Sequence, residues 1–149
     1  MAKVKDKNHL PKIKKQIQNL AKKEIKTGVF NPGTLRYTIA AVHEYGTNIG
    51  VTGGMRNWFL AQGYPLPSDM THITIPERSF IRSTFDQEQD EMVRQSKRAV
   101  GFMLDGDWDE QQVARTIGAY VVDRIRQRVE SQFVMRTGEL RDSIQYKVE

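Results

Sequence analysis

The stretch from Ile73 to Phe85 combines the pattern of a strand with that of a helix, so two elements of different kind must meet there. It reads Ile-Thr-Ile-Pro-Glu-Arg-Ser-Phe-Ile-Arg-Ser-Thr-Phe. The first three residues alternate as in a half-buried strand, and Pro76 ends the strand because it lacks an N–H and fixes its own φ. After Ser79, the expected N-cap, apolar residues follow at helical spacing. They are Ile81, Phe85, Met92, Ala99 and Met103. The stretch therefore predicts a strand-to-helix corner and a helix over residues 79–104.

The segment before this corner predicts a short helix from Ile39 to Tyr45, ended by Gly46 in a left-handed conformation. A short strand over residues 35–38 is expected to precede it. Glu44 lies near the end of the helix. We expect its carboxylate to pair with Arg78 or Arg82, because the fork of an arginine suits a carboxylate held on another element.

Three short motifs resemble a known family. They are Ile-Ala-Ala-Val-His-Glu-Tyr-Gly-Thr (39–47), Ile-Pro-Glu-Arg-Ser-Phe-Ile-Arg (75–82) and Thr-Gly-Glu-Leu-Arg-Asp-Ser-Ile (137–144). In this order they resemble the head–tail joining and tail-completion proteins of tailed phages. The resemblance implies a non-catalytic virion protein, made in the cytoplasm of the host bacterium. It would form a hexameric ring with copies of itself and contact the tail tube and the neck or connector proteins.

Two sets of residues within these motifs are expected to have structural roles. The first set is expected to build the corner and consists of Glu44, Gly46, Pro76, Arg78, Phe80 and Arg82. The second set is expected to form a short turn capped by Thr137, and consists of Thr137, Gly138, Leu140 and Ser143.

Residues 47–74 form a long connection inserted between the predicted helix and strand. A connection of this length inside a compact domain usually has a use. Thr52 is expected to cap a short helix that Gly63 ends. The candidate contacts with other subunits or partners in this arm are Arg56, Trp58, Phe59 and Tyr64. The same aromatic residues equally fit a small satellite core.

The positive charge is concentrated at the N-terminus. Residues 1–26 contain nine lysines and two acidic residues, a net charge of +7, whereas the whole chain carries +5. Apolar residues from Leu10 to Ile25 predict a peripheral basic helix over residues 10–27, ended by Gly28. Its lysines suit a solvated face, a short coiled-coil contact, or a surface that meets DNA or an acidic partner. A DNA-binding or packaging accessory protein is therefore the alternative function, while a ring subunit would contact DNA in its lumen only weakly.

The C-terminal half carries the clearest helix, over residues 108–131, and we expect Asp107 and Glu110 to form its capping box. Its apolar stripe consists of Val113, Ile117, Val121, Ile125 and Val129. A final strand is predicted over residues 144–148, where apolar residues alternate. We therefore expect one α+β domain over residues 1–149, with a small, mostly antiparallel sheet packed on the helices 79–104 and 108–131.

Several functions have little support in the sequence. The chain has no cysteine, which excludes disulfides, a thiolate metal site and a cysteine nucleophile. His43 and Glu44 lack the second histidine of a zinc helix, because position 47 is Thr. No apolar run has membrane-spanning length, and the N-terminus lacks the apolar core of a signal peptide. We expect neither an enzyme nor a protein with a cofactor, a bound metal or a membrane partner.

Overall fold

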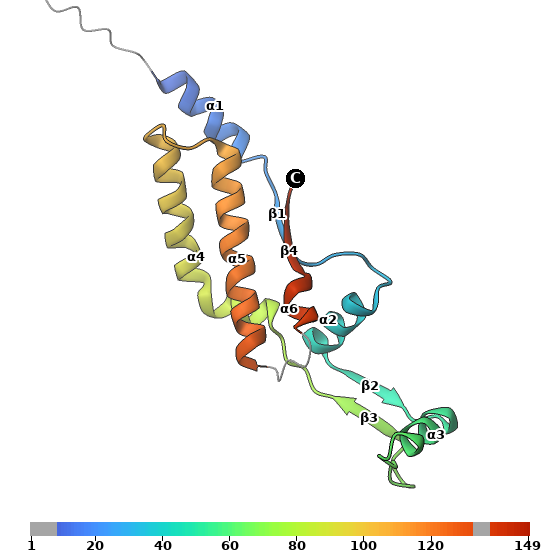
Figure 1. Ribbon diagram of the computed structural model, residues 1–149. Coiled ribbons are helices and arrows are strands. Elements are labelled where there is room, and N and C mark those ends of the chain that lie inside the picture. The colour runs from blue at the N-terminus through green and yellow to red at the C-terminus, as the bar shows by residue number, and fades with distance from the viewer. Residues whose placement is uncertain (1–8, 133–137) are drawn as a thin grey trace, which may run out of the picture.

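Helix α5 (Glu110–Gln132) is the centre of the body in the computed structural model, which describes residues 9–132 and 138–149. Its predicted apolar stripe faces inward. Val113, Val121, Ile125 and Val129 are buried, and Ile117 is half-buried. Helix α4 (Ile81–Leu104) runs antiparallel beside α5 (Figure 1).

Two terminal strands cover another side of α5. Strand β1 (Ile25–Val29) pairs antiparallel with β4 (Ile144–Val148), so that Val29 lies opposite Ile144. Ile144 is fully buried and joins the core around Ile125. The first and last parts of the chain thus close the core together.

A second pair of strands leaves the body as an arm (Figure 1). Helix α2 (Leu35–Tyr45) is followed by β2 (Thr47–Gly50), α3 (Gly53–Ala61) and β3 (His72–Ile75), and β2 pairs antiparallel with β3. Helix α1 (Leu10–Leu20) lies at the opposite end of the body, and the short α6 (Glu139–Ser143) packs against α2.

The predicted α+β class is confirmed: two main helices pack against a small antiparallel sheet. A second two-stranded sheet lies in the arm. The helix predicted over residues 10–27 is too long, because residues 25–29 form β1. Their partner is at the far end of the chain, so local apolar spacing could not reveal the pairing.

Three local predictions differ from the structure. The strand over residues 35–38 is wrong, since Thr34 accepts a hydrogen bond from the N–H of Tyr37 and starts α2 there. The capping box of α5 is formed by Asp109 and Gln112, each accepting the other's backbone N–H, instead of by Asp107 and Glu110. On α4, Phe85 was expected on the buried face but is 42% exposed.

The close contact between α5 and β4 gives a first test. A Cβ on Gly118 would approach the ring of Tyr146 to 2.5 Å. We expect Gly118→Ala to lower the free energy of unfolding by about 2 kcal/mol, because β4 would have to shift. Gly101→Ala is the matched control, since a Cβ there meets nothing within 4 Å. It should raise that free energy by about 0.5–1 kcal/mol. Urea unfolding of both variants measures the difference, and equal effects would contradict the close approach.

Candidate functional site

The carboxylate of Glu44, near the end of α2, accepts hydrogen bonds from the backbone N–H groups at the N-terminus of α4. Glu44 is 4% exposed. One carboxylate oxygen accepts hydrogen bonds from the backbone N–H groups of Phe80 and Ile81, both at 2.9 Å. The other accepts from the N–H of Arg82 at 3.0 Å and from the hydroxyl of Ser79 at 2.8 Å. Because the first N–H groups of a helix have no partner inside it, Glu44 acts as an N-cap supplied by a distant segment.

The prediction that Ser79 is the N-cap of α4 is therefore wrong. Phe80 occupies that position and makes no side-chain cap hydrogen bond. The hydroxyl of Ser79 donates to Glu44 and accepts the N–H of Ser83 at 3.3 Å. A carboxylate is the stronger acceptor for these N–H groups, and its charge also suits the positive end of the helix dipole.

The environment of Glu44 keeps it ionised. Burial by itself would raise the pKa of the carboxyl. The hydrogen bonds from the backbone N–H groups of Arg82 and Ile81, from the Ser79 hydroxyl and from the Phe80 N–H outweigh this effect and hold the pKa below its ordinary value. The folded protein thus binds a proton at this site less readily than the unfolded chain does.

Of the two arginines expected to pair with Glu44, Arg82 makes the bond. Its Nε lies 3.1 Å from the carboxylate, and another nitrogen donates to the backbone carbonyl of Glu44 at 2.7 Å and to Glu77 at 2.6 Å. Arg78 instead joins α2 through its backbone N–H, which donates to the carbonyl of His43 at 2.8 Å. Burial lowers the pKa of His43, and the charge of Arg78 lowers it further.

The remaining corner residues tie the arm to the core. Gly46 has φ 68°, and a Cβ there would lie 2.8 Å from the backbone nitrogen of Glu77, so only glycine fits this turn. Pro76 follows the last residue of β3. Phe80 is fully buried in the core beside α5. The corner therefore holds both strands of the arm at the point where α4 begins.

The C-terminal motif forms the short helix α6. Gly138, with φ 71°, precedes it, and Leu140 packs against the core. The hydroxyl of Ser143 donates to the carbonyl of Leu140 at 2.7 Å, so it is held by its own helix. Thr137 lies outside the described residues.

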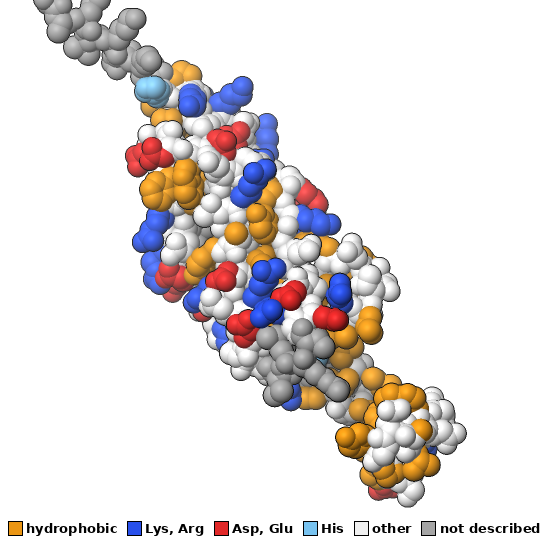
Figure 2. All heavy atoms as spheres, in the orientation of Figure 1, with side chains coloured by type: hydrophobic (Ala, Val, Ile, Leu, Met, Phe, Trp, Pro, Cys, Tyr) orange, Lys and Arg blue, Asp and Glu red, His pale blue; other side chains and the backbone are white. Residues whose placement is uncertain are grey.

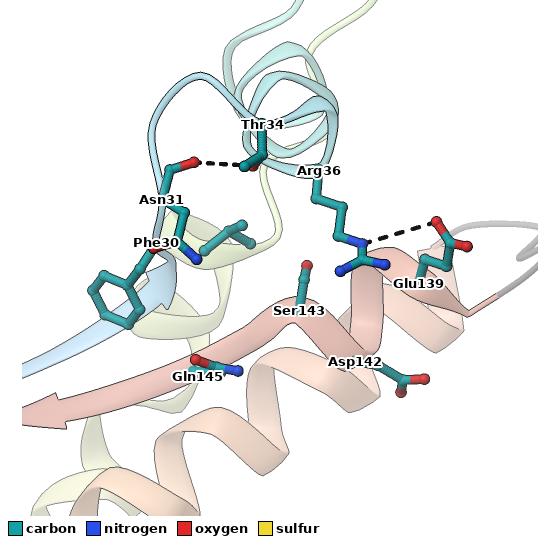
Figure 3. Close-up of a pocket in the computed structure, with 9 residues that line it drawn as sticks. Phe30, Asn31, Thr34, Arg36, Glu139, Asp142, Ser143 and Gln145 are labelled. Atoms are coloured by element: carbon teal, nitrogen blue, oxygen red, sulfur yellow. Dashed lines mark hydrogen bonds and ion pairs between the residues drawn. The ribbon is translucent and has the colours of Figure 1, made fainter.

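A small polar pocket of about 280 Å³ lies between this motif and the start of α2 (Figure 3). Arg36 and Glu139 face each other across it, with Nε and the nearest carboxylate oxygen 3.9 Å apart. Thr34 donates to the carbonyl of Asn31 at 2.9 Å. The ion pair lies between α2 and α6, and the Thr34 hydrogen bond supports the turn into α2.

The arm has its own internal hydrogen bonds. The N–H of Val51 donates to the carbonyl of Thr71 at 2.8 Å and extends the hairpin beyond β2. Thr52 caps α3 as predicted, accepting the N–H of Met55 at 3.2 Å. The guanidinium of Arg56 donates to the backbone carbonyls of residues 67, 68 and 70. Arg56 therefore fastens the loop after α3, and its donors are occupied within the arm.

Three large apolar side chains near the end of the arm are exposed. Trp58 is 58% exposed, Tyr64 is 74% exposed, and Leu60 between them is 63% exposed. Phe59 is half-buried, with its ring edge-to-face against Trp58. Figure 2 shows hydrophobic side chains gathered on this end of the molecule. We call Trp58, Leu60 and Tyr64 the arm tip.

Helix α1 is fixed to the body at its C-terminal end. Leu20 packs on the cluster between α4 and α5. Asn19 donates to Glu110 at 3.0 Å, and Lys23 donates to Gln111 at 2.8 Å. The exposed lysines of this segment are Lys12, Lys14, Lys15 and Lys22. The basic helix is thus docked, and most of its described charge faces solvent.

A second apolar surface runs along α4 and was not predicted. Phe85, Val93 and Leu104 are 42%, 45% and 44% exposed and line a groove beside α5. Its other apolar residues are Met92, Val100, Ile117 and Val121. We call this surface the α4 groove. The apolar spacing on α4 carried the signal, but the sequence did not show which side of this helix faces α5.

Metal sites, membrane-spanning helices and similarity to known proteins give no assignment of function. Among residues 9–132 and 138–149, no group of His, Asp or Glu side chains is arranged to hold a metal ion. No helix in that part of the chain has the length and apolarity needed to cross a bilayer. No family model, curated protein or solved structure matches the chain.

The cap made by Glu44 gives a second test. Glu44→Gln puts an amide N–H₂ against N–H donors, so we expect it to lower the free energy of unfolding by about 2–4 kcal/mol at pH 7. Because the folded pKa is depressed, the stabilisation by Glu44 is present above about pH 4.5 and is lost as the pH falls through the folded value. The variant should therefore lose less stability than wild type between neutral pH and that acid range.

Glu77→Gln is the control for this variant, since Glu77 also pairs with Arg82 but is exposed. It should change stability little. Urea unfolding at several pH values measures all three proteins, and an unchanged acid response of Glu44→Gln would contradict the role of the carboxylate.

Proposed function

We propose that this chain is a structural, non-catalytic subunit of the head–tail junction of a tailed phage. Its copies form a hexameric ring that completes the tail and joins it to neck or connector proteins in the virion. The proposal starts from the resemblance of residues 39–47, 75–82 and 137–144 to head–tail joining and tail-completion proteins.

One observation supports it above all others: the exposed arm tip. Trp58, Leu60 and Tyr64 are large side chains of which more than half is exposed on a projecting hairpin. Tryptophan and tyrosine are the residue types that most often dominate binding energy at protein interfaces. Exposed apolar side chains at the end of a hairpin suit the face of a neighbouring copy. Repeated around an axis, such a head-to-tail contact closes a ring.

The corner explains how an arm could bind with precision. Strand β2 begins and strand β3 ends beside the Glu44 cap, which holds α2 on the start of α4. A buried carboxylate with several donors resists rotation of one element against the other. The corner therefore restricts the direction in which the arm leaves the body, which would reduce the entropy lost on association.

Removing the arm tip tests the proposal. We expect the purified wild-type protein to form rings in electron micrographs, alone or on tail tubes. Trp58→Ala combined with Tyr64→Ala should abolish ring formation while leaving the thermal unfolding midpoint unchanged, because both side chains are exposed. The matched control is Asn57→Ala with Gln62→Ala, two exposed polar positions in and just after α3. Rings that persist without the aromatic pair, or particles absent from every wild-type sample, would contradict the proposal.

A second candidate function is DNA binding through α1. Lys12, Lys14 and Lys15 are exposed on α1, and exposed Lys22 follows the helix; this concentration of positive charge is the observation that favours it. Such a protein would bind DNA mainly through phosphate contacts, whose strength falls steeply with salt.

Salt dependence separates the two functions. A protein that binds DNA through several lysine–phosphate contacts should lose its affinity about 100-fold or more between 50 and 200 mM salt. For the ring subunit we expect weak binding at 50 mM salt that Lys12→Gln, Lys14→Gln and Lys15→Gln remove without affecting rings. Fluorescence anisotropy with a labelled duplex measures this. Tight DNA binding by a wild-type protein that never forms rings would favour the second function.

A further inference from the structure

The α4 groove has a charge pattern that complements a second copy of itself. Asp90 lies one helical turn before Val93, and Asp86 lies two turns before it. Lys97 lies one turn after Val93 on the same flank. All four residues are exposed. We propose that two copies of this chain bind through the α4 groove, with the two α4 helices antiparallel about a two-fold axis near Val93.

The antiparallel direction follows from the charges. A two-fold axis near Val93 places Asp90 of each copy beside Lys97 of the other, so one pairing occurs twice. A parallel arrangement in register would place Asp90 next to Asp90 and Lys97 next to Lys97. Like charges in contact oppose association, so the pattern selects the antiparallel dimer.

The apolar residues fit the same arrangement. Val93 of each copy lies at the axis. Val100 lies opposite Asp86 of the other copy and one turn from its Gln89. Leu104 lies within about one turn of Phe85 of that copy. Phe85, Val93 and Leu104 are the large apolar side chains that the groove leaves 42–45% exposed. The dimer would remove these uncovered side chains from water.

The size of the contact predicts its strength. From Phe85 to Leu104 the helix is about 29 Å long, and with a helix width of about 10 Å its footprint is about 300 Å² per copy. Stable interfaces usually bury about 800 Å² per partner. The dimer is therefore weak, with a dissociation constant in the micromolar range or above.

Two other segments of a second copy fit the groove less well. The lysines of α1 would meet Asp86 and Asp90 favourably but would lie beside Lys97 as well. The arm tip consists of uncharged side chains, and the guanidinium of Arg56 is bound within the arm. The exposed Asp69 nearby could match Lys97 but would be repelled by Asp86 and Asp90. The antiparallel α4 pair covers the exposed apolar residues and places Asp90 of each copy beside Lys97 of the other.

The dimer does not depend on the proposed ring, which uses the arm tip. It can be measured in a chain that carries Trp58→Ala and Tyr64→Ala, so that ring formation does not interfere. The dimer is thus tested in that variant, whereas ring formation is tested in the chain with an intact arm tip, so failure of one proposal can be told from failure of the other.

The absence of cysteine allows a direct position test. Val93→Cys places one thiol at the axis, and mild oxidation should give a covalent dimer. Arg98→Cys is the control, since Arg98 is exposed on a different side of α4. We expect the Val93→Cys protein to cross-link at least about ten times faster. Equal rates for the two positions would overturn the proposal.

Charge reversal tests the pairing itself. Sedimentation equilibrium at 50 mM salt should show dimer dissociation constants raised at least about ten-fold by Asp90→Lys or by Lys97→Asp alone. An equimolar mixture of the two variants should regain the dimer, because each Lys then faces an Asp. The double variant Asp90→Lys/Lys97→Asp should regain it too. Gln87→Lys, at an exposed position away from the groove, should have no effect.

Unchanged thermal unfolding of each variant would show that the fold is retained. A wild-type groove that remains monomeric up to millimolar concentration, or a mixture that regains nothing, would overturn the proposal. So would a dimer that is lost only when residues 1–20 are removed, since α1 would then be the occupant.

Discussion

The hydrogen bonds between the Glu44 carboxylate and the N-terminus of α4 hold together segments 36 residues apart in the chain. Burying a carboxylate is unfavourable unless several donors surround it, and the first turn of a long helix supplies those donors. Everything between the two segments is the arm. The cap therefore fixes where the arm leaves the body and how α2 packs, and Gly46 makes the turn that the arm needs.

Patterns carried within one element were readable from the sequence. Four such features depend only on neighbours in the chain. They are the apolar stripe on α5, the N-cap at Thr52, the helix end at Gly46 and the strand before Pro76. The strand β1 was missed because its partner β4 is at the far end of the chain, and its residues also fit a helical stripe. Long-range pairing overrides local spacing, and one sequence does not show which distant segment will supply the partner.

The candidate site was predicted only in part for a similar reason. A pairing of Glu44 with an arginine follows from their chemistry, and Arg82 provides it. The larger role of Glu44, as acceptor for backbone N–H groups, has no side-chain signature, because any helix offers those donors. Conversely, Arg56 looked available for a partner, but three carbonyls of a nearby loop occupy it. The exposure of the α4 groove depends on how α5 and β4 pack in the core, which the sequence of α4 alone does not show.

The two proposed contacts differ in symmetry, and this difference determines how they could coexist. An arm-tip contact joins two different surfaces, the arm tip of one copy and another face of its neighbour. In a closed ring, both surfaces of every copy are bound. An α4 contact joins like surfaces and is complete with two copies. Closing a ring makes the last contact intramolecular, which strengthens it without adding area. A weak two-fold contact would therefore not compete with ring closure. It could remain available to join one ring to another face to face, because α4 and the arm tip lie on different parts of the molecule.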